Sequence, residues 1–535
     1  MRYGALALAW TMAGVLALGG PAHAFSLAGN ETIDGTAWHG YAAASGDGSR
    51  GAPWTYNIAE NVDLAGYTVG TATAPGATTY RGSVTLNVTG SILDTGGGGT
   101  FDASTTNSRH GGSIKLTATS SVAATYIKTG TDQYQTFHGG DVYVSAGGAV
   151  TVDNGAGVGA IDSSAAEYKG AGGNVTVIAG GGADITIGKN ASNWSVNASS
   201  YRQNKGGNVL LQTSGNATLA GGVDTRGARY TDGDGKKSGD VTINGGSRAG
   251  DVSIGGSILT NTGRHSSTSG LGGDVSVEAA SLAVSGNIVT WGNQGNFGGN
   301  PGGRGGNVDV DVTGDCTVTG YIDTRQTYNN QYTSAGGRVA ITADHIRVEG
   351  VDGSGRSIVT ENVHGGPQRS LRPDQANVRL IGTDSSTEYY NGAMSDPDDP
   401  AQAPLGGDTS SVYVAGDIVT SYGGQASSLG NVTVEAVGIW LGGDVILKDP
   451  QGKTSAQTID IDYGVADYGV VTHLYERGSW VQWDGVSAHL RTYTGDAVTF
   501  DATVPYAGAG GLLVPEPAAL GLLGLAALAI RKRMR

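Results

Sequence analysis

Residues 206–227, GGNVLLQTSGNATLAGGVDTRG, contain the repeating unit that decides the fold of this chain. The unit divides into three short extended runs, 209–211, 217–219 and 223–225, which are separated by glycine and small polar residues. None of these runs is long enough to bury a face by itself. If copies of the unit are stacked, each run gains a parallel partner above and below it.

Copies of this unit recur along the chain at nearly constant spacing. The glycine before the first run recurs with successive separations of 28, 33, 34, 32, 34, 33 and 31 residues, at Gly112, Gly140, Gly173, Gly207, Gly239, Gly273, Gly306 and Gly337. Such a period indicates a solenoid, a propeller or an array. Three runs without a recurrent aromatic landmark disfavour a propeller blade, and period-two alternation disfavours helices. We therefore predict an all-β fold, a right-handed parallel β-helix (β-solenoid) of about ten three-strand coils.

Composition narrows the functions that the chain can have. Of its 535 residues 94 are glycine, without the three-residue period of collagen, and only 15% are charged. The formal net charge of −15 disfavours nucleic acid as a partner. The single cysteine, Cys316, excludes a disulfide framework and a cysteine-rich metal site, and its place in the second run predicts a small buried residue.

The N-terminal part of the chain does not follow the repeat. Residues 1–24 have the pattern of a secretory signal peptide, with Arg2, an apolar stretch and a small-x-small cleavage site at Ala22 and Ala24. Residues 25–80 are predicted to form an N-terminal cap, because an open solenoid end would expose unpaired backbone. A small binding module in this segment is the alternative.

The β-helix is predicted over residues 81–449, and an antiparallel C-terminal β cap over residues 450–508. One long break, residues 383–408, interrupts the coils and contains two Asp-Pro pairs. Because proline cannot donate a hydrogen bond to a strand ladder, we expect this break to be an excursion outside the core.

Two positions recur in the coils and predict how neighbouring coils are joined. The third run often ends in threonine, from Thr129 to Thr420, and we expect the stacked hydroxyl groups to hydrogen-bond along the solenoid axis. The residue after the glycine is Asp or Asn from Asp141 to Asn307. This position predicts a stacked turn ladder rather than a row of calcium ligands.

Loops of variable length follow the third run and should leave the same corner of each coil, so that they line one side of the rod. They carry aromatic residues with arginines nearby, a combination that suits stacking on sugars and hydrogen bonding to them. The candidate carbohydrate contacts, including two from the excursion, are Trp291, Phe297, Tyr328, Tyr332, Arg325, Tyr389 and Tyr390. The alternative is that the loops only pack on themselves.

The sequence predicts no catalytic residues. A glycosidase needs two carboxyl groups about 5 to 9 Å apart. The outward acids predicted for the third run do not fall on adjacent coils: Asp94, Asp162, Asp224 and Asp323. There is no HExxH motif, and Asp232 and Asp234 resemble only part of a calcium loop. We therefore expect no metal ligands and no cofactor, with structural calcium as the alternative.

The C-terminus carries a second targeting pattern. An apolar run over 518–530, shorter than a usual spanning helix, ends in a basic cluster, and the residues before it are Val514, Pro515, Glu516 and Pro517. This order, over residues 509–535, resembles the PEP-CTERM sorting signal of Gram-negative bacteria that produce exopolysaccharide. The resemblance implies processing by signal peptidase and an exosortase, transient membrane anchoring through the C-terminal helix, and export to the cell surface or extracellular matrix.

The predicted coils are also similar in architecture to filamentous-haemagglutinin-like and pectate-lyase-like β-helices, although no two-partner secretion domain and no long C-terminal barrel is recognisable. Those families include adhesins and polysaccharide-cleaving enzymes, so the fold does not decide the function. The leading hypothesis is a non-enzymatic exported protein, structural or adhesive, that contacts exopolysaccharide, biofilm matrix or neighbouring cells. The alternative is a polysaccharide lyase or glycoside hydrolase with its site on the loop-bearing side.

Overall fold

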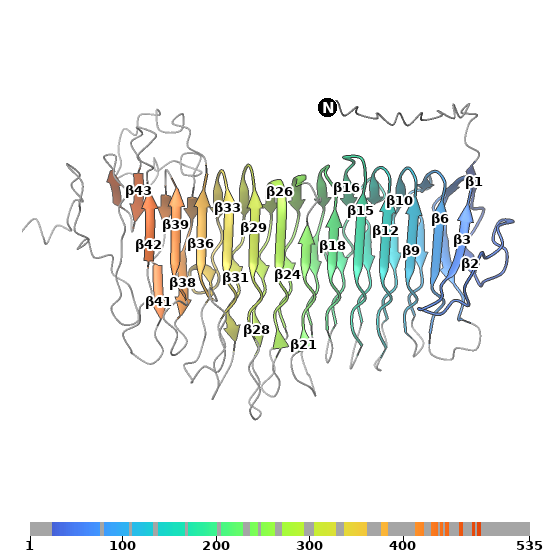
Figure 1. Cartoon of the computed structure of the whole chain (residues 1–535), viewed down its shortest axis with the longest axis horizontal. Coiled ribbons are helices and arrows are strands. Elements are labelled where there is room, and N and C mark those ends of the chain that lie inside the picture. The colour runs from blue at the N-terminus through green and yellow to red at the C-terminus, as the bar shows by residue number, and fades with distance from the viewer. Residues whose placement is uncertain are drawn as a thin grey trace, which may run out of the picture.

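The computed structural model shows a parallel β-solenoid that extends along one axis (Figure 1). Apolar side chains at alternate strand positions point into one continuous core, in which Val209 and Leu211 are 1% and 0% exposed. The structure describes residues 24–74, 80–105, 110–131, 137–165, 170–200, 205–227, 236–243, 248–262, 270–293, 304–327, 336–360, 376–383, 412–421, 430–436, 439–441, 445–448, 459–463, 473–476 and 479–482. Within these ranges there is no helix.

Each coil contributes strands to three faces, which we call the first, second and third sheets. The first sheet contains β3 (Trp54–Ile58), β6 (Val84–Val88), β9 (Ile114–Ala118), β12 (Val142–Ala146), β15 (Val175–Ala179), β18 (Val209–Gln212), β22 (Val241–Ile243), the start of β26 (Val275–Val284), β29 (Val308–Val312), β33 (Val339–Ala343), β36 (Val378–Gly382), β39 (Val432–Ala436) and β42 (Ile459–Tyr463).

The second sheet follows in each coil and is joined to the first through β26. It contains β1 (Ala24–Ser26), β4 (Asn61–Asp63), β7 (Ile92–Leu93), β10 (Val122–Ala124), β13 (Val150–Val152), β16 (Ile185–Ile187), β19 (Ala217–Leu219), β23 (Ala249–Ile254), the end of β26, β30 (Cys316–Val318), β34 (Ile346–Val348), β37 (Val412–Val414), β40 (Ile439–Leu441) and β43 (His473–Glu476). Cys316 is 1% exposed in β30, as predicted, and burial raises the pKa of its thiol to about 12.

The third sheet has 13 strands, more than the about ten coils that the sequence predicts. It contains β2 (Glu31–Ile33), β5 (Thr68–Thr71), β8 (Thr100–Asp102), β11 (Tyr126–Lys128), β14 (Ala160–Asp162), β17 (Trp194–Asn197), β20 (Gly222–Asp224), β24 (Ile258–Leu259), β27 (Ile288–Val289), β31 (Ile322–Asp323), β35 (Arg356–Val359), β38 (Asp417–Ser421) and β41 (Val445–Lys448). The parallel β-helix that the repeat predicts is therefore confirmed.

The N-terminal segment belongs largely to the solenoid, although we predicted a separate cap over residues 25–80. Strands β1, β2 and β3 pair in parallel with β4, β5 and β6. The end of the stack is covered by the chain between β2 and β3, where Trp38 is 6% exposed and lies with its ring centroid 5.5 Å from that of Phe25. The aromatic residues of this segment conceal the repeat because they replace its valines.

The described strands of the predicted C-terminal cap include both parallel and antiparallel pairs. Strands β42 and β43 continue the parallel stack on β39 and β40, and only β44 (Ser479–Gln482) is antiparallel, to β43. The antiparallel arrangement predicted over 450–508 is thus wrong for β42 and β43. The excursion predicted over residues 383–408 falls between β36 and β37, and residues 384–408 lie outside the described residues.

Paired glycines begin the first-sheet strands because backbone atoms occupy the space that side chains would need. A Cβ atom on Gly206 would lie 1.9 Å from the carbonyl oxygen of Thr225, and one on Gly207 would lie 1.9 Å from that of Gly173. The same contact recurs at 1.9 Å from Gly239 to Gly207 and from Gly306 to Gly273. Neither glycine of the pair therefore leaves room for a side chain.

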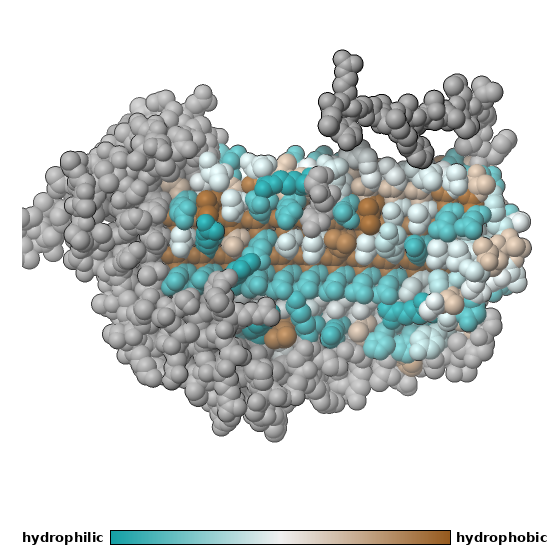
Figure 2. All heavy atoms as spheres, viewed as in Figure 1, coloured by the Kyte–Doolittle hydropathy of each residue, from teal (hydrophilic) through white to brown (hydrophobic). Residues whose placement is uncertain are grey.

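The residue after the glycine pair forms the predicted ladder. The side-chain Oδ1 atom in one coil accepts the backbone N–H of the same position in the next coil, at 2.7–3.1 Å, from Asp141, Asn174, Asn208, Asp240, Asp274 and Asn307. The backbone N–H that each Asp or Asn side chain accepts thus belongs to the next coil, and not to its own turn. Figure 2 shows a hydrophilic row along the rod, beside the first sheet.

The threonines that end the third sheet do not hydrogen-bond to one another, so the predicted axial threonine ladder is wrong. The Thr225 hydroxyl donates to the carbonyl oxygen of Gly239 at 2.6 Å, and the Thr225 carbonyl accepts the Gly239 N–H at 2.9 Å. We call this pair of bonds the corner clasp. Hydroxyl groups make the same side-chain bond at Thr129, Ser163, Thr260, Thr290, Thr324, Thr360 and Thr420.

Replacing Gly207 with alanine should destabilise the rod, because the added Cβ must displace a carbonyl of the neighbouring coil. We expect a loss of about 1–3 kcal/mol in the free energy of unfolding. Gly353→Ala is the matched control, since no atom lies within 4 Å of the added Cβ. Urea unfolding followed by circular dichroism measures both variants, and equal midpoints would contradict the proposed role of the glycine column.

Candidate interaction surface at the loop edge

In each coil the described residues on either side of a variable loop lie at one corner of the rod, between the third sheet and the next first-sheet strand. We call this corner the loop edge. Four short strands at the loop bases form a sheet of their own: β21 (Lys236–Lys237), β25 (Gly270–Leu271), β28 (Gly292–Asn293) and β32 (Gln326–Thr327). Isolated parallel bridges join other loop bases, such as Thr105 to Thr131 and Thr131 to Ala165. The loop bases are therefore fixed relative to one another.

Four residues that follow the clasp position lie in a row on successive coils: Arg226, Asn261, Trp291 and Arg325. We call this set the loop-edge row. Backbone hydrogen bonds hold its members in register, since Thr262 N–H donates to the Trp291 carbonyl and Gly292 N–H donates to the Arg325 carbonyl. Trp291 is partly exposed, and the two arginine side chains are 43% and 15% exposed.

The two arginines of the loop-edge row are held by the aspartate two residues before them. Arg226 donates from Nε and Nη2 to the Asp224 carboxylate at 2.9 and 2.6 Å. Arg325 binds Asp323 in the same way, with Nη2 at 2.6 Å. Both carboxylates are almost fully buried, and the hydrogen bond to Asp224 raises the pKa of Arg226. Each Asp-Thr-Arg sequence therefore presents a guanidinium group in a fixed orientation.

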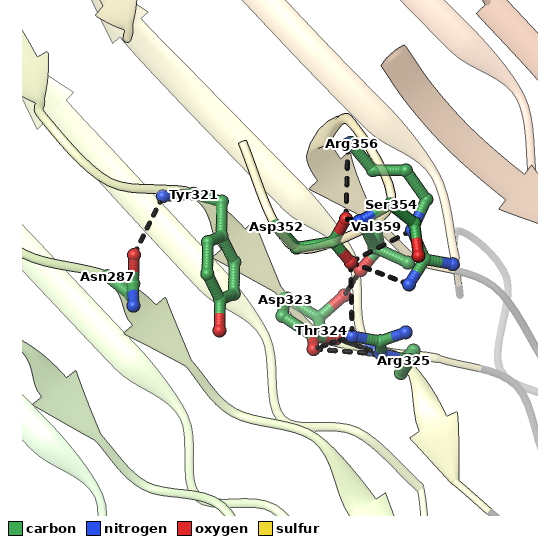
Figure 3. A network of polar contacts seen from close by, with 9 residues as sticks. All are labelled: Asn287, Tyr321, Asp323, Thr324, Arg325, Asp352, Ser354, Arg356 and Val359. Carbon is green, nitrogen blue, oxygen red and sulfur yellow. Dashed lines mark hydrogen bonds and ion pairs between the residues drawn. The ribbon is translucent and has the colours of Figure 1, made fainter. Parts of the chain in front are cut away.

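A larger ion network surrounds Arg325 (Figure 3). Asp352, from the turn before β35, lies 3.5 Å from the Arg325 guanidinium and accepts bonds from Arg356 at 2.9 and 2.6 Å. Burial raises the pKa of Asp323 despite its arginine partners. For Asp352, burial is outweighed by hydrogen bonds from Arg356 and Ser354, and the pKa falls to about 2. The sequence analysis missed Asp352 and Arg356, whose only signal is a glycine-rich turn between them.

The opposite pKa shifts of Asp323 and Asp352 are the kind of difference that acid–base catalysis uses. Their side chains, however, are only 3% and 8% exposed, and guanidinium groups bind both of them. A carboxylate that must reach a glycosidic bond cannot remain so enclosed. The network therefore fits a support for Arg325 better than a hydrolytic dyad.

One of the acids that we predicted to face outward from the third sheet lies elsewhere. The Asp94 carboxylate accepts the Gly66 and Gly99 N–H groups and the Thr125 hydroxyl, so it holds turns together. Asp102 occupies the outward position instead, in register with Lys128. Asp102 and Asp162 are thus separated by a lysine, and within the described part of this column no two acids are adjacent.

The structure places only part of the predicted site. Trp291 and Arg325 are brought together as neighbours in the loop-edge row. The other predicted sugar contacts, Phe297, Tyr328, Tyr332, Tyr389 and Tyr390, lie outside the described residues, as do Asp232, Asp234, Ala22 and the sorting signal at 514–517. Ala24 is the first residue of β1.

A second cluster at the loop edge, near the N-terminus, was missed by the sequence analysis. The rings of Tyr80 and His110 stack with centroids 4.6 Å apart, and those of His110 and His138 with centroids 5.1 Å apart. Nδ1 of His110 accepts the His138 N–H, and Nδ1 of His138 accepts the Ala171 N–H. Both bonds require an unprotonated Nδ1 atom. The signal in the sequence is the residue before the glycine pair, which is histidine at both 110 and 138.

In comparisons with known proteins, no family model, no curated protein and no solved structure matches the chain. In the part of the chain that the structure describes, no three His, Cys, Asp or Glu residues gather as a metal site. The same residues include no helix of the length and hydropathy needed to cross a membrane.

The histidine stack predicts a loss of stability in mild acid. Burial, together with the charges of His138 and Arg50, lowers the pKa of His110 to about 4 from an ordinary value of 6.5. The unfolded chain therefore takes up the proton first, so this contribution is complete above about pH 6.5 and declines as the pH falls towards 4. Unfolding midpoints measured across this range should fall less steeply for His110→Gln, whereas equal slopes would contradict the assignment.

Proposed function

We propose that this protein is an exported, non-enzymatic rod of the cell surface or extracellular matrix that binds polysaccharide along its loop edge. The observation that carries the proposal is the loop-edge row, in which Trp291 lies between Asn261 and Arg325 on successive coils. An indole offers a flat face to the C–H groups of a sugar ring, while a guanidinium group donates to its hydroxyls. Asn261 is 7% exposed, so Trp291 and the two arginines are the members that face a ligand.

The fixed arginines strengthen this interpretation. A guanidinium group held by a buried carboxylate has already lost most of its side-chain freedom, so little further entropy is lost when it binds a ligand. Because Asp224 and Asp323 balance the charges of Arg226 and Arg325, these arginines act as oriented donors rather than as an anion-binding patch. This chemistry suits hydroxyl-rich ligands.

Export is proposed on the sequence patterns at the two ends of the chain. Residues 1–24 supply a signal peptide for signal peptidase, and residues 509–535 supply a PEP-CTERM-like signal for an exosortase. On this proposal the chain of a Gram-negative bacterium is held in the membrane by its apolar tail until it is processed. A solenoid with close-packed coils suits the extracellular space, because it offers few sites for proteases.

The second candidate function is a polysaccharide lyase or glycoside hydrolase with its site on the loop-bearing side. The pKa difference between Asp323 and Asp352 is the one observation in its favour. Their burial and their bonds to arginine weigh against it. We therefore place binding ahead of cleavage.

Replacing Trp291 with alanine should weaken retention of the purified secreted protein on polysaccharide beads. Loss of one stacking contact of about 0.5–1.5 kcal/mol lowers the affinity roughly two- to tenfold. Thr218→Ala, on the outer side of β19, is the matched control and should bind normally. We expect no new reducing ends or unsaturated products, with or without calcium. Unchanged retention of Trp291→Ala would exclude the loop-edge row, and turnover abolished by Asp323→Asn would establish the enzyme.

Mass spectrometry of the secreted protein tests the export proposal. We expect the mature chain to begin at Phe25 and to end near residues 514–517, because both flanking segments have served as targeting signals. A Glu516→Ala variant should keep its tail and stay with the membrane. Secreted protein that retains residues 518–535 would rule out exosortase processing.

A further inference from the structure

Trp194 is a partly exposed indole on the outer side of the third sheet, and the loop-edge row does not include it. It begins β17, directly after a turn in which the Asn190 side-chain oxygen accepts the backbone N–H groups of Ser192 and Trp194 at 2.9 and 3.0 Å. Asn193, the last residue of this turn, takes a positive φ of 64°, which is uncommon for a residue other than glycine. The backbone is therefore constrained directly before the indole, and such constraint often accompanies a functional site.

A β-bulge directs the Trp194 side chain outward. Trp194 pairs with Gly222 of β20, and Val196 pairs with the next residue, Val223, so that Ser195 is an extra residue in β17. Ser195 is 0% exposed, and its hydroxyl oxygen accepts the Gly221 N–H at 2.8 Å. Without the bulge, strand alternation would leave serine at the outward position and turn the indole inward.

The indole lies against Gly222 and beside Arg226, the first member of the loop-edge row. A Cβ atom on Gly222 would be 2.7 Å from Cζ3 of Trp194, so the glycine leaves the space that the ring occupies. The guanidinium carbon of Arg226 lies 5.7 Å from the centroid of the Trp194 ring, within the range of a cation–π contact. Because Asp224 also binds this guanidinium group, the arginine is fixed next to the indole.

The same turn and bulge occur at one other place in the part of the chain that the structure describes, beyond the far end of the loop-edge row (Figure 3). Asp352 there takes the place of Asn190, and Arg356 takes that of Trp194. Both Arg356 and Arg325 contact the Asp352 carboxylate. The row thus runs from β20 to β31 between two bulged strands, β17 and β35, and each bulge places a side chain next to an arginine of the row.

Trp194 and Trp291 are so far apart that only an extended ligand could contact both. Three steps between paired strands separate them, from β17 through β20 and β24 to β27, or about 14 Å along the rod. Trp194 lies level with Gly222, four residues before the loop-edge row, which adds about 13 Å across the third sheet. The two indoles are therefore about 20 Å apart on an oblique line. This line crosses β24, where the outward residue Leu259 is partly exposed.

These dimensions limit what could occupy the surface. Two single indoles about 20 Å apart do not form the contiguous apolar centre of a protein interface, which covers about 800 Å² on each partner. A peptide strand would need a free strand edge, but β20 is paired on both sides, with β17 and β24. Nucleic acid is disfavoured by the net charge of −15. A linear polymer with flat apolar faces and many hydroxyl groups meets these limits.

We propose that Trp194 is a second stacking residue of the loop-edge site, and that a single glycan strand crosses the third sheet obliquely from Trp291, past Arg226, to Trp194. The inference rests on the proposed function, because it adds a contact and a direction to the same site. The two indoles stack on sugar rings, and Arg226 donates to hydroxyl groups between them. A strand on this path contacts both indoles, whereas a strand that follows the loop-edge row parallel to the rod contacts only Trp291.

Substitutions at Trp194 test the oblique path. Leucine keeps apolar bulk against Gly222 but removes the ring, whereas tyrosine restores a ring. Retention of the full secreted protein is measured on amorphous cellulose, chitin and dextran beads. On the bead that retains the wild type, we expect Trp194→Leu to lower the affinity roughly two- to tenfold with an unchanged unfolding midpoint, and Trp194→Tyr to recover most of the loss.

Tyr126→Leu is the matched control and should bind normally. Tyr126 is partly exposed on the same side of the third sheet, and Nζ of Lys128 lies 4.8 Å from the centroid of its ring. It therefore resembles Trp194 in having a cation beside an exposed ring. It lies two coils before Trp194, on β11, and away from the loop-edge row.

Chain length supplies a second measurement, which a purely structural role of Trp194 would not change. Soluble oligosaccharides of the polymer on the retaining bead are used as competitors. For the wild type, inhibition should strengthen once the competitor is long enough to span about 20 Å, because one chain then contacts both indoles. This gain should be absent in Trp194→Leu.

Three results would overturn the inference. Unchanged retention of Trp194→Leu, together with the loss expected for Trp291→Ala, would leave the proposed function standing without the oblique path. An equal loss in Tyr126→Leu would show that the effect does not belong to the bulged site. A lower unfolding midpoint of Trp194→Leu, with normal retention of its folded fraction, would assign the indole to packing. Absence of wild-type retention on all three beads would overturn both proposals.

Discussion

The close approach of successive coils at the paired glycines is the constraint on which the rest of this structure depends. Parallel strands stack about 4.8 Å apart, and at the corner before most first-sheet strands from β9 to β33 backbone carbonyl groups occupy the Cβ positions of both glycines. A larger residue in such a pair would force that corner open, and strands β22 and β36 depart from the pair: β22 is preceded by Ser238, and before β36 Ala376 takes a positive φ of 58°. Because the corner is the same in each coil, the clasp residue, the loop base and the residue after the clasp also recur at the same place. The loop edge is thus a consequence of backbone packing, and the identity of its side chains is free to vary from coil to coil.

Stacking also brings like side chains together, so the chain must control its charges. Two carboxylates about 5 Å apart repel each other by roughly 3 kcal/mol at an effective dielectric constant of 20. The ladder limits this repulsion by mixing Asp with Asn, and where Asp240 and Asp274 are adjacent, Lys237 binds both at 2.6 and 2.8 Å. Burial lowers the pKa of that lysine, but the bonds to the two aspartates outweigh burial and raise it. At the loop edge Asp224 and Asp323 likewise have arginine partners. Because stacked carboxylates must be neutralised, arginines are paired with aspartates at the loop edge, and this pairing orients their guanidinium groups.

The sequence predicts those features that repeat and misses those that occur once. The spacing of glycines and the alternation of valine with polar residues predict the solenoid, and the Asp/Asn position predicts the ladder. The prediction that the threonine hydroxyls bond to one another along the axis was wrong. A residue that repeats in each coil does not by itself reveal which group its side chain binds. Asp352 and Arg356 meet Arg325 through a turn whose counterpart, between Asn190 and Trp194, has the same hydrogen bonds but uncharged side chains at both positions.

A solenoid repeats its corner in each coil, so a ligand bound at one coil meets a corner of similar backbone geometry on the next. On our proposal, the members of the loop-edge row each bind a glycan strand weakly, and linked contacts raise the overall avidity by a factor of about 10²–10⁴ when they are engaged together. The stiffness set by the glycine corners then has a function of its own, since it keeps the loop bases of successive coils at a constant spacing along the rod.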